Sequence, residues 1–312
     1  MNHIIDNTKS INETLKICAP GDIIILKPGI YHEKVEIYNN NIVIRGESQT
    51  DTIISNKDFY HKIMPDYNEC NTFRTYTCYV EGDNVTIENL TIENTAIPSK
   101  IYGQAVALHV HGDNFKCIGC TLNSAQDTLF TGPLPKNLLE RHKGFLPDNF
   151  LKGSASKQIY QNCKIYGDVD FIFGCATALF INCDIISIDH NNPGRSPDGY
   201  ICAPSHYQET KYGYLFYKCK LIKQNDNVKD VFLGRPWRDY GCAAFIECEM
   251  DNHINPLGFN KWGNTDRDKT ARFYEYTNTP CEGREPWVNI LTKAEADKYV
   301  KAFLEFVNFN KN

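Results

Sequence analysis

Six segments of the chain repeat one pattern of apolar and polar positions. Each has two short runs of β-branched, aromatic or other apolar residues on either side of a bend marked by Asn or Cys. The segments are residues 84–92, 114–122, 158–165, 179–185, 215–221 and 244–250. Short runs of this composition, bounded by polar residues, predict two strands joined at a bend in every segment.

The spacing of the repeats indicates how these strands stack. The bend marks fall at Asn89, Cys120, Cys163, Cys183, Cys219 and Cys248, with gaps of 31, 43, 20, 36 and 29 residues. The shortest gap suits one bare coil of a solenoid, and the longer gaps suit the same coil with loops inserted. A sandwich would need hairpin turns at roughly 8–12-residue intervals, and such turns are scarce. We therefore predict an all-β parallel solenoid in which each strand stacks on the equivalent strand of the next coil.

Both ends of the chain carry a helix signal. Ser10 and Glu13 have the spacing of a capping box, as do Thr292 and Glu295, and the second pair opens an amphipathic run that reaches Phe306. We expect both helices to cover the ends of the solenoid. The prediction is one domain over residues 1–312, with an N-terminal cap at 1–28, a loop insertion at 132–157 and a C-terminal helical segment at 285–312 that packs on the solenoid.

The insertion contains the one sizeable basic cluster of the sequence, formed by Lys136, Arg141, Lys143 and Lys152. A solvated loop is the simpler interpretation of such a cluster, because charged runs usually face water. A lip over an anionic substrate is the functional alternative.

Composition and charge narrow the class of protein. The chain is 42% hydrophobic and 23% charged, and it has no apolar run near the roughly 18 residues that a membrane span needs. A net charge of −5 argues against a nucleic-acid partner, which usually requires a basic surface. The start lacks a basic and then apolar leader, so we expect a cytoplasmic protein as the sequence stands, and a secreted one if a signal has been removed.

The thirteen cysteines favour thiols over disulfides. Their number is odd, and most lie within apolar strands, where a reduced cysteine acts as a small buried hydrophobe. Cys117 and Cys120 form the lone pair with a zinc-like spacing, but they fall in a predicted strand, so we expect no metal site there.

Polar residues that interrupt apolar strands are the candidates for chemistry. They are Gln104, the pair Gln126 and Asp127, Asp170, and Arg235. Each alone has a structural explanation, such as a turn residue or an arginine packed on a tryptophan. Together they form an acyl-transfer set, because two carboxylates, two amides and a guanidinium could provide a nucleophile, an acid and oxyanion donors. No Gly-x-Ser-x-Gly elbow offers a serine instead.

Strand alternation predicts how two of these motifs point. Asp168 and Asp170 should face away from Val169, Phe171 and Phe173, so the carboxylates would face a cleft if the aromatic rings fill the interior. In the second motif, Pro236 holds Arg235 extended, so Arg235 and Trp237 should project together, as a cation beside an aromatic platform.

Five motifs in order resemble those of the pectin methylesterase family. They are Gly29–Glu33, Gly103–Leu108, Gln126–Leu129, Asp170–Gly174 and Leu233–Trp237, and the similarity continues to Trp262 and to Lys269–Phe273. One such motif would be weak evidence, whereas five in order form a specific pattern. The resemblance implies a single-stranded right-handed parallel β-helix that hydrolyses methyl esters of pectin or of methylated oligogalacturonides.

The resemblance also implies a role for each matched residue. Asp170 would attack the ester to give an acyl-enzyme, and Asp127 would protonate the departing methanol and then activate water. Gln104 and Gln126 would stabilise the oxyanion, and Arg235 would hold Asp170 by a charge-assisted hydrogen bond. The sugar cleft would be lined by Phe130, Phe173, Trp237 and Trp262. No metal or organic cofactor is implied, and we expect a monomer that binds neither nucleic acid nor membrane.

Two departures from the family pattern concern substrate contacts. Phe130 stands where many members have Tyr, and Cys175 stands where Asn or Ser is commoner. The insertion after Thr131 is similar to that of bacterial members. The alternatives are an esterase or thioesterase acting on a different small substrate, a β-helix polysaccharide lyase or glycoside hydrolase, and a non-catalytic carbohydrate-binding β-helix.

Overall fold

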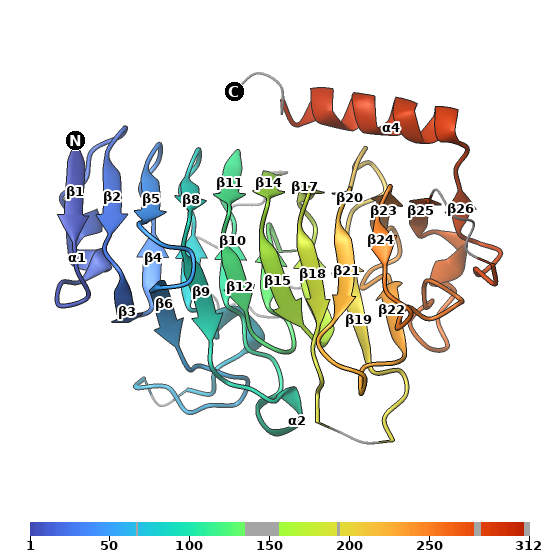
Figure 1. Cartoon of the computed structure of the whole chain (residues 1–312), viewed down its shortest axis with the longest axis horizontal. Helices are drawn as coiled ribbons and strands as arrows, with labels where there is room; N and C mark the ends of the chain where they lie inside the picture. Colours follow the sequence, from blue (N-terminus) through green and yellow to red (C-terminus); the bar gives the residue numbers. More distant parts are fainter. Residues whose placement is uncertain (67, 135–155, 192–193, 278–281, 309–312) are drawn as a thin grey trace.

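The computed structural model describes residues 1–66, 68–134, 156–191, 194–277 and 282–308. Its strands form three parallel sheets that run side by side along the long axis of an elongated molecule (Figure 1). The chain visits the three sheets in turn and comes back one strand further along, so each circuit is one coil of a parallel β-helix. The predicted all-β solenoid is confirmed.

The strand bounds follow the order of each sheet within the described residues. The eleven-stranded sheet contains β1 (Asn2–Ile5), β2 (Ile23–Leu26), β5 (Val43–Gly46), β8 (Thr86–Glu88), β11 (Phe115–Ile118), β14 (Lys157–Gln161), β17 (Thr177–Ile181), β20 (Tyr214–Tyr217), β23 (Cys242–Ile246), β25 (Arg272–Tyr276) and β26 (Asn289–Ile290). The eight-stranded sheet contains β3 (Gly29–His32), β6 (Thr52–Asn56), β9 (Thr91–Asn94), β12 (Thr121–Asn123), β15 (Lys164–Gly167), β18 (Asp184–Ser187), β21 (Lys220–Lys223) and β24 (Glu249–Met250). The seven-stranded sheet contains β4 (Val35–Ile37), β7 (Cys78–Val80), β10 (Leu108–Val110), β13 (Leu129–Thr131), β16 (Val169–Gly174), β19 (Gly199–Pro204) and β22 (Val231–Gly234).

Helices are few in the described ranges. The α-helices are α1 (Ile11–Leu15), α2 (Ser99–Tyr102) and α4 (Lys293–Phe306). Two 3₁₀ turns lie in loops: η1 (Thr72–Arg74) precedes β7, and η3 (Arg267–Lys269) precedes β25. None of the described helices is long and apolar enough to cross a membrane.

The predicted bends lie between the eleven-stranded and eight-stranded sheets. The bend residue of each coil has a positive φ between 53° and 60°, and the series is Asn89, Gly119, Asn162, Asn182, Lys218 and Glu247. The residue after the bend points into the core, which gives a buried column of Leu90, Cys120, Cys163, Cys183, Cys219 and Cys248. Taking Asn89 as equivalent to these cysteines was therefore wrong by one residue, because Asn suits the left-handed bend and Cys the interior position.

Aromatic side chains from successive coils stack in the interior. Tyr160, Phe180, Phe216 and Phe245 occupy equivalent register positions, and neighbouring ring centroids are 4.8, 4.6 and 4.3 Å apart. Parallel in-register pairing forces identical positions to overlap, so one aromatic per coil produces a continuous stack. All twelve cysteines within the described ranges are unpaired thiols, as expected.

Helix α1 lies near the N-terminal end of the solenoid and packs beside β4 (Figure 1). Ser10 caps it by accepting from the Glu13 amide at 3.1 Å. The carboxylate of Glu33 then accepts from the Ser10 hydroxyl and from the amides of Ile11 and Asn12. The Gly29–Glu33 motif is thus structural, because Glu33 satisfies the free N–H groups at the start of α1.

Helix α4 has the predicted capping box between Thr292 and Glu295 but not the predicted position. It lies along the side of the solenoid, parallel to its long axis, rather than across its end (Figure 1). Ala296, Val300 and Phe303 pack on the outer face of the eleven-stranded sheet, against side chains such as Leu179 and Leu215. The outer positions of these strands are apolar and need a cover, which is why the helix lies there.

The basic cluster of the insertion lies outside the described residues. Within 132–157 the structure describes only residues 132–134 and 156–157, and the latter enter β14. The choice between a solvated loop and a lip over the substrate stays a prediction.

Candidate active site

Four coils contribute the five candidate catalytic residues to one cavity on the seven-stranded sheet. Gln104 precedes β10, Gln126 and Asp127 precede β13, Asp170 lies in β16, and Arg235 follows β22. The cavity has a volume of about 300 Å³. Its lining residues are Thr72, Phe73, Gln104, Gln126, Asp127, Asp170, Phe173, Ala203, Arg235, Trp237 and Trp262. The five candidate catalytic residues, which lie up to 131 positions apart in the sequence, meet because the coils stack in register.

The two glutamines lie on adjacent coils. Gln104 and Gln126 form an isolated parallel bridge, in which the Ala105 amide donates to the Gln126 carbonyl at 3.0 Å. Gly103 ends α2 with φ 70° and ψ −140°, a conformation that a side chain would oppose. The glycine therefore lets the chain leave α2 and bring Gln104 beside Gln126, where two amide groups line the same wall of the cavity.

Asp127 and Asp170 share an unusual backbone conformation. Their φ angles are 65° and 49°, in the left-handed region that residues other than glycine seldom occupy. The Asp127 amide donates to the Val169 carbonyl at 3.1 Å, which joins the two segments. Such conformations cost free energy and concentrate at functional sites, where the surrounding structure imposes them.

The predicted alternation along β16 is wrong, because the strand contains a bulge. Val169 pairs with Tyr200 and Ile172 with Cys202, so Asp170 and Phe171 together lie opposite a single residue. Phe171 enters the core as predicted, but Phe173 emerges on the same side as Asp170 and lines the cavity.

Asp168 does not line the cavity. Its buried carboxylate accepts from the Ser99 hydroxyl and from the Val169 amide. It therefore connects α2 to the start of β16. Gln104 follows α2 and Asp170 lies in β16, so this connection helps to hold both residues in place.

Arg235 holds Asp170 with two hydrogen bonds. Its Nε donates to Oδ1 at 2.8 Å and its Nη2 donates to Oδ2 at 2.6 Å. The guanidinium lies between two rings, 3.8 Å from the Tyr200 centroid and 4.0 Å from the Trp262 centroid. Trp237 shares the cavity with Arg235 as predicted, but Tyr200 and Trp262 are the platform for the cation. A planar cation stacked on both faces is fixed for bidentate contact with a carboxylate.

The electrostatic environments of the two acids differ. Burial raises the pKa of Asp127 well above its usual range, and the nearby Asp170 carboxylate raises it further. Burial also raises the pKa of Asp170, but the Arg235 charge and hydrogen bonds oppose that effect. Asp170 is therefore the first of the two to lose its proton, and Asp127 is the one that keeps it.

The aromatic residues predicted to line the cleft divide into two groups. Phe173, Trp237 and Trp262 line the cavity, whereas Phe130 is fully buried and does not reach it. Phe130 packs below, with its ring 5.4 Å from Phe73 and 4.9 Å from Phe173. The strand register explains this position, since Phe130 pairs with Phe173 on the next coil and η1 covers it.

Sequence reasoning missed Tyr200, Thr72 and Phe73. Tyr200 could have been found from the sequence. It pairs in register with Phe232, so an aromatic residue recurs at the same position of two successive coils. Thr72 and Phe73 come from η1 in an irregular loop, and no periodicity in the sequence marks them.

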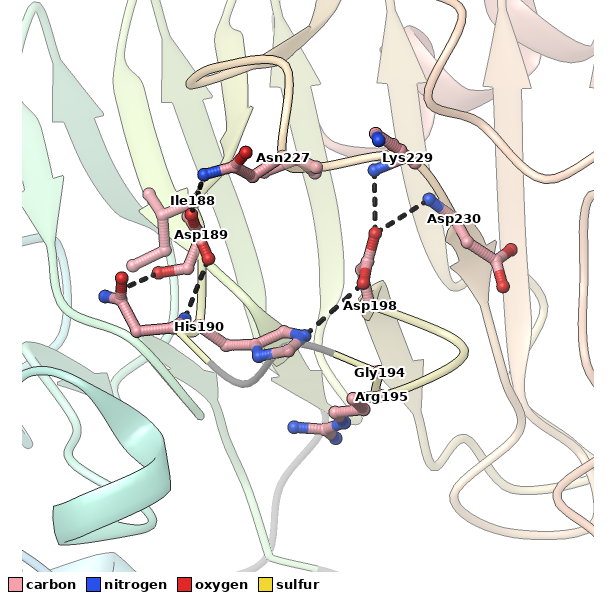
Figure 2. Close-up of a pocket in the computed structure, with 11 residues that line it drawn as sticks. Ile188, Asp189, His190, Gly194, Arg195, Asp198, Asn227, Lys229 and Asp230 are labelled. Carbon is pink, nitrogen blue, oxygen red and sulfur yellow. Dashed lines mark hydrogen bonds and ion pairs between the residues drawn. The ribbon is translucent and has the colours of Figure 1, made fainter.

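A larger cavity, of about 520 Å³, lies between the loop after β18 and the loop before β22. Figure 2 shows Asp198, the last residue of the first loop, reaching the second loop, where its carboxylate accepts from the amides of Lys229 and Asp230 at 2.7 and 3.0 Å. Asp189 accepts from Asn227, which lowers its pKa. The hydrogen bonds of Asp189 and Asp198 join the two loops, whereas the smaller cavity brings together two buried carboxylates and an arginine, so the smaller cavity is the candidate active site.

Comparison with known proteins gives the family of this chain. The pectinesterase family profile matches residues 5–134 and 148–305, and it leaves out residues 135–147 of the predicted insertion. Pectinesterase 31 of Arabidopsis thaliana is 31% identical over 294 residues, which cover 89% of this chain and 81% of that protein. A probable pectinesterase/pectinesterase inhibitor 36 of the same plant is 32% identical over 82% of this chain. The chain spans about half the length of the first curated relatives that it matches.

Solved structures agree in fold. Pectin methylesterase PemA from Erwinia chrysanthemi has a TM-score of 0.77 and 25% identity, with 97% of this chain and 96% of that chain covered. The enzyme from Yersinia enterocolitica has a TM-score of 0.75 and 29% identity, with 93% and 96% covered. The fold is therefore the right-handed parallel β-helix expected, the hand that parallel crossovers almost always take. With the family profile matched over nearly its whole length, this chain belongs to the pectinesterase family.

Proposed function

We propose that this chain hydrolyses methyl esters of pectin or of methylated oligogalacturonides, releasing methanol and a free carboxylate. One observation carries the proposal: an arginine-bound carboxylate and a buried, proton-retaining carboxylate face the same cavity. Two glutamines share that cavity. A related pectin methylesterase of 26% identity has been solved in complex with a hexasaccharide, which supports an oligosaccharide as the class of substrate.

Asp170 is the nucleophile in this scheme. Arg235 keeps it ionised and orients one oxygen toward the ester carbonyl. Attack forms a bond from the Asp170 oxygen to the carbonyl carbon, and the electron pair of the C=O moves to oxygen. Side-chain N–H groups of Gln104 and Gln126 stabilise the resulting oxyanion as donors placed before the reaction begins.

Asp127 carries the proton. It donates its proton to the methoxy oxygen as the tetrahedral intermediate collapses, and methanol leaves with an acyl-Asp170 anhydride behind it. The Asp127 carboxylate then takes a proton from water, whose oxygen attacks the anhydride carbonyl and restores both acids. The raised pKa of Asp127 suits both halves of this cycle, because the group must hold a proton and then accept one.

Phe173, Trp237 and Trp262 contribute to the apolar part of the cavity, together with Phe73 and Ala203. Sugar rings pack well on aromatic faces, and the methyl group needs an apolar contact. The overall charge of −5 offers no long-range attraction to a polyuronate, so we propose that local contacts in the cleft hold the substrate.

The products distinguish this proposal from its rivals. Incubation with methylated pectin and, in parallel, with short methylated oligogalacturonides should release methanol without new reducing ends and without unsaturated uronate. Reducing ends would indicate a glycosidase, and unsaturated uronate would indicate a lyase. Turnover of small esters or thioesters with no methanol from either uronate substrate would contradict the proposed substrate class.

A further inference from the structure

Three side chains with metal-binding atoms meet at the N-terminal end of the solenoid. His3 lies in β1, Cys18 follows α1, and Asp22 precedes β2 (Figure 1). The coil that carries Asp170 lies about five strands further along the sheet, or roughly 24 Å. This cluster is therefore separate from the candidate active site, and no step of the proposed reaction uses it.

The geometry of the cluster suits a metal ion. One ligand atom from each of the three residues lies within 4.8 Å of the other two. Nε2 of His3 is 2.9 Å from Oδ2 of Asp22. In a tetrahedral zinc site, bonds of about 2.0–2.3 Å place neighbouring ligand atoms about 3.5 Å apart. The three atoms already lie close to that spacing, so small side-chain rotations would bring them around one ion.

Exposure and chemistry also distinguish these residues. Cys18 is partly exposed, whereas the other cysteines within the described ranges are buried in the solenoid. His3 is partly exposed and Asp22 is buried, so an ion could enter from the solvent past His3 and bind the buried carboxylate of Asp22. Imidazole, thiolate and carboxylate together are a ligand set that zinc and its neighbours prefer.

We propose that His3, Cys18 and Asp22 bind a borderline divalent cation, Zn²⁺ in the first place, as a structural site. The ion would join three separate segments, β1, the loop after α1 and the start of β2. These segments form the terminal coil, where β1 is the edge of the eleven-stranded sheet. An open sheet edge is a weak point of a solenoid, and a cross-link of three segments stabilises it.

Binding requires three rearrangements. The Met1 amine, which contacts Oδ1 of Asp22, must move away as the cation takes its place. The Cys18 thiol, which donates to the Thr14 carbonyl at 3.2 Å, loses its proton to the solvent, and the sulfur–metal bond forms with the thiolate. Nε2 of His3, which is hydrogen-bonded to Oδ2 of Asp22, releases its proton to the solvent and binds the ion as a neutral ring nitrogen. Water completes the coordination of the ion.

The competing explanation is a simple ion pair between His3 and Asp22 with a nearby thiol. Titration of the full chain with Co²⁺ separates the two, since a thiolate ligand gives a charge-transfer absorption that an ion pair cannot produce. We expect one Co²⁺ per chain with that absorption, displaced by Zn²⁺. At zinc concentrations about 100-fold above Kd, the Tm should rise by about 5 °C.

Matched variants test the ligands. Cys18→Ser keeps the hydrogen bond to Thr14 but should abolish the absorption and weaken zinc binding about 100-fold, and His3→Gln should weaken it at least about tenfold. His61→Gln alters another histidine–carboxylate pair, with Glu69, so this variant should bind zinc as the parent chain does. Absence of saturable binding, or absorption that persists in Cys18→Ser, would overturn the proposal.

Discussion

Two outer faces of the solenoid carry large apolar side chains, one beneath α4 and one around the candidate active site. Beneath α4, residues such as Leu179, Leu215 and Ala244 keep regular strand alternation and are fully buried by a helix. Around the site, the seven-stranded sheet mixes Phe173 with two buried acids, and its backbone breaks the alternation with a bulge. The face beneath α4 thus shows regular strand alternation and apolar burial, whereas the face around the candidate site has a bulge and buried acids.

The departures coincide at the same residues. Asp127 and Asp170 have left-handed backbones, are almost fully buried, and have raised pKa values. Each of these features costs folding free energy, whereas the face beneath α4 gains it by burying apolar surface. When several unfavourable features occur at the same residues, they indicate a functional site, because nothing in folding itself would favour them. The comparison predicts that changes at the site alter rate, and changes beneath α4 alter stability.

The largest effect is expected from Asp170→Asn. The amide has almost the same shape but cannot attack the ester, so methanol release should fall by about 10⁴-fold or more. Binding of a methylated oligogalacturonide, measured by calorimetry, should persist. Asp226→Asn is the control, since it removes an exposed acid that does not line the cavity. Retained turnover in Asp170→Asn would refute the assigned nucleophile.

Phe303→Ala tests the opposite face. Phe303 is fully buried against the outer face of the eleven-stranded sheet, and its truncation should lower the free energy of unfolding by about 3–5 kcal/mol. Urea unfolding measures this loss, and kcat/KM below the unfolding transition should not change. Phe306→Ala, on the partly exposed side of the same helix, should cost clearly less. A large loss of kcat/KM in folded Phe303→Ala would break the division between the two faces.

Tyr200→Leu should act on rate through Arg235. Removing one of the two rings that hold the guanidinium should reduce kcat/KM by about tenfold. The acid limb of the pH–rate profile should also move to higher pH, because a looser Arg235 lowers the pKa of Asp170 less. Tyr200→Phe keeps the ring and should behave like the parent. An unshifted acid limb in Tyr200→Leu would show that Tyr200 does not position Arg235.

The smallest effect concerns the pH dependence of stability. The folded pKa of Asp127 lies above the unfolded value of about 3.9, so the folded chain holds this proton more tightly. The contribution of Asp127 to stability is complete below about pH 3.9 and is lost as pH rises through the folded pKa. Asp127→Asn should therefore flatten the fall in stability over that range, as followed by urea unfolding at several pH values. An unchanged slope would contradict a buried, protonated Asp127.

The sequence predicted the coil pattern well because that pattern is local. One bend and one inward residue per coil give a repeat that can be read along the chain, as in Asn182 and Cys183. The helix starts at Ser10 and Thr292 could also be predicted, because the side chains that cap the free N–H groups of a helix lie within three residues of one another.

The sequence motifs identified the residues of the candidate site, but they did not predict the contacts around those residues. Gln104, Asp127, Asp170 and Arg235 were identified, yet their chemistry depends on neighbours that the sequence does not place beside them. Tyr200 reaches Arg235 from another coil, and η1 covers Phe130, which ended below the cleft rather than in it. Such contacts depend on loop lengths between coils, which the motifs do not specify.

What the sequence by itself determined is a stack of parallel coils with a helix start near each end and a set of acids, amides and a guanidinium in fixed order. Only the tertiary structure decided that β16 bulges and turns Phe173 to the side of Asp170, that α4 lies along the flank, and that the two acids differ in proton affinity. The physical reason is range. Periodicity and capping act over a few residues, whereas burial, register shifts and electrostatic fields depend on groups that come together only when the coils stack.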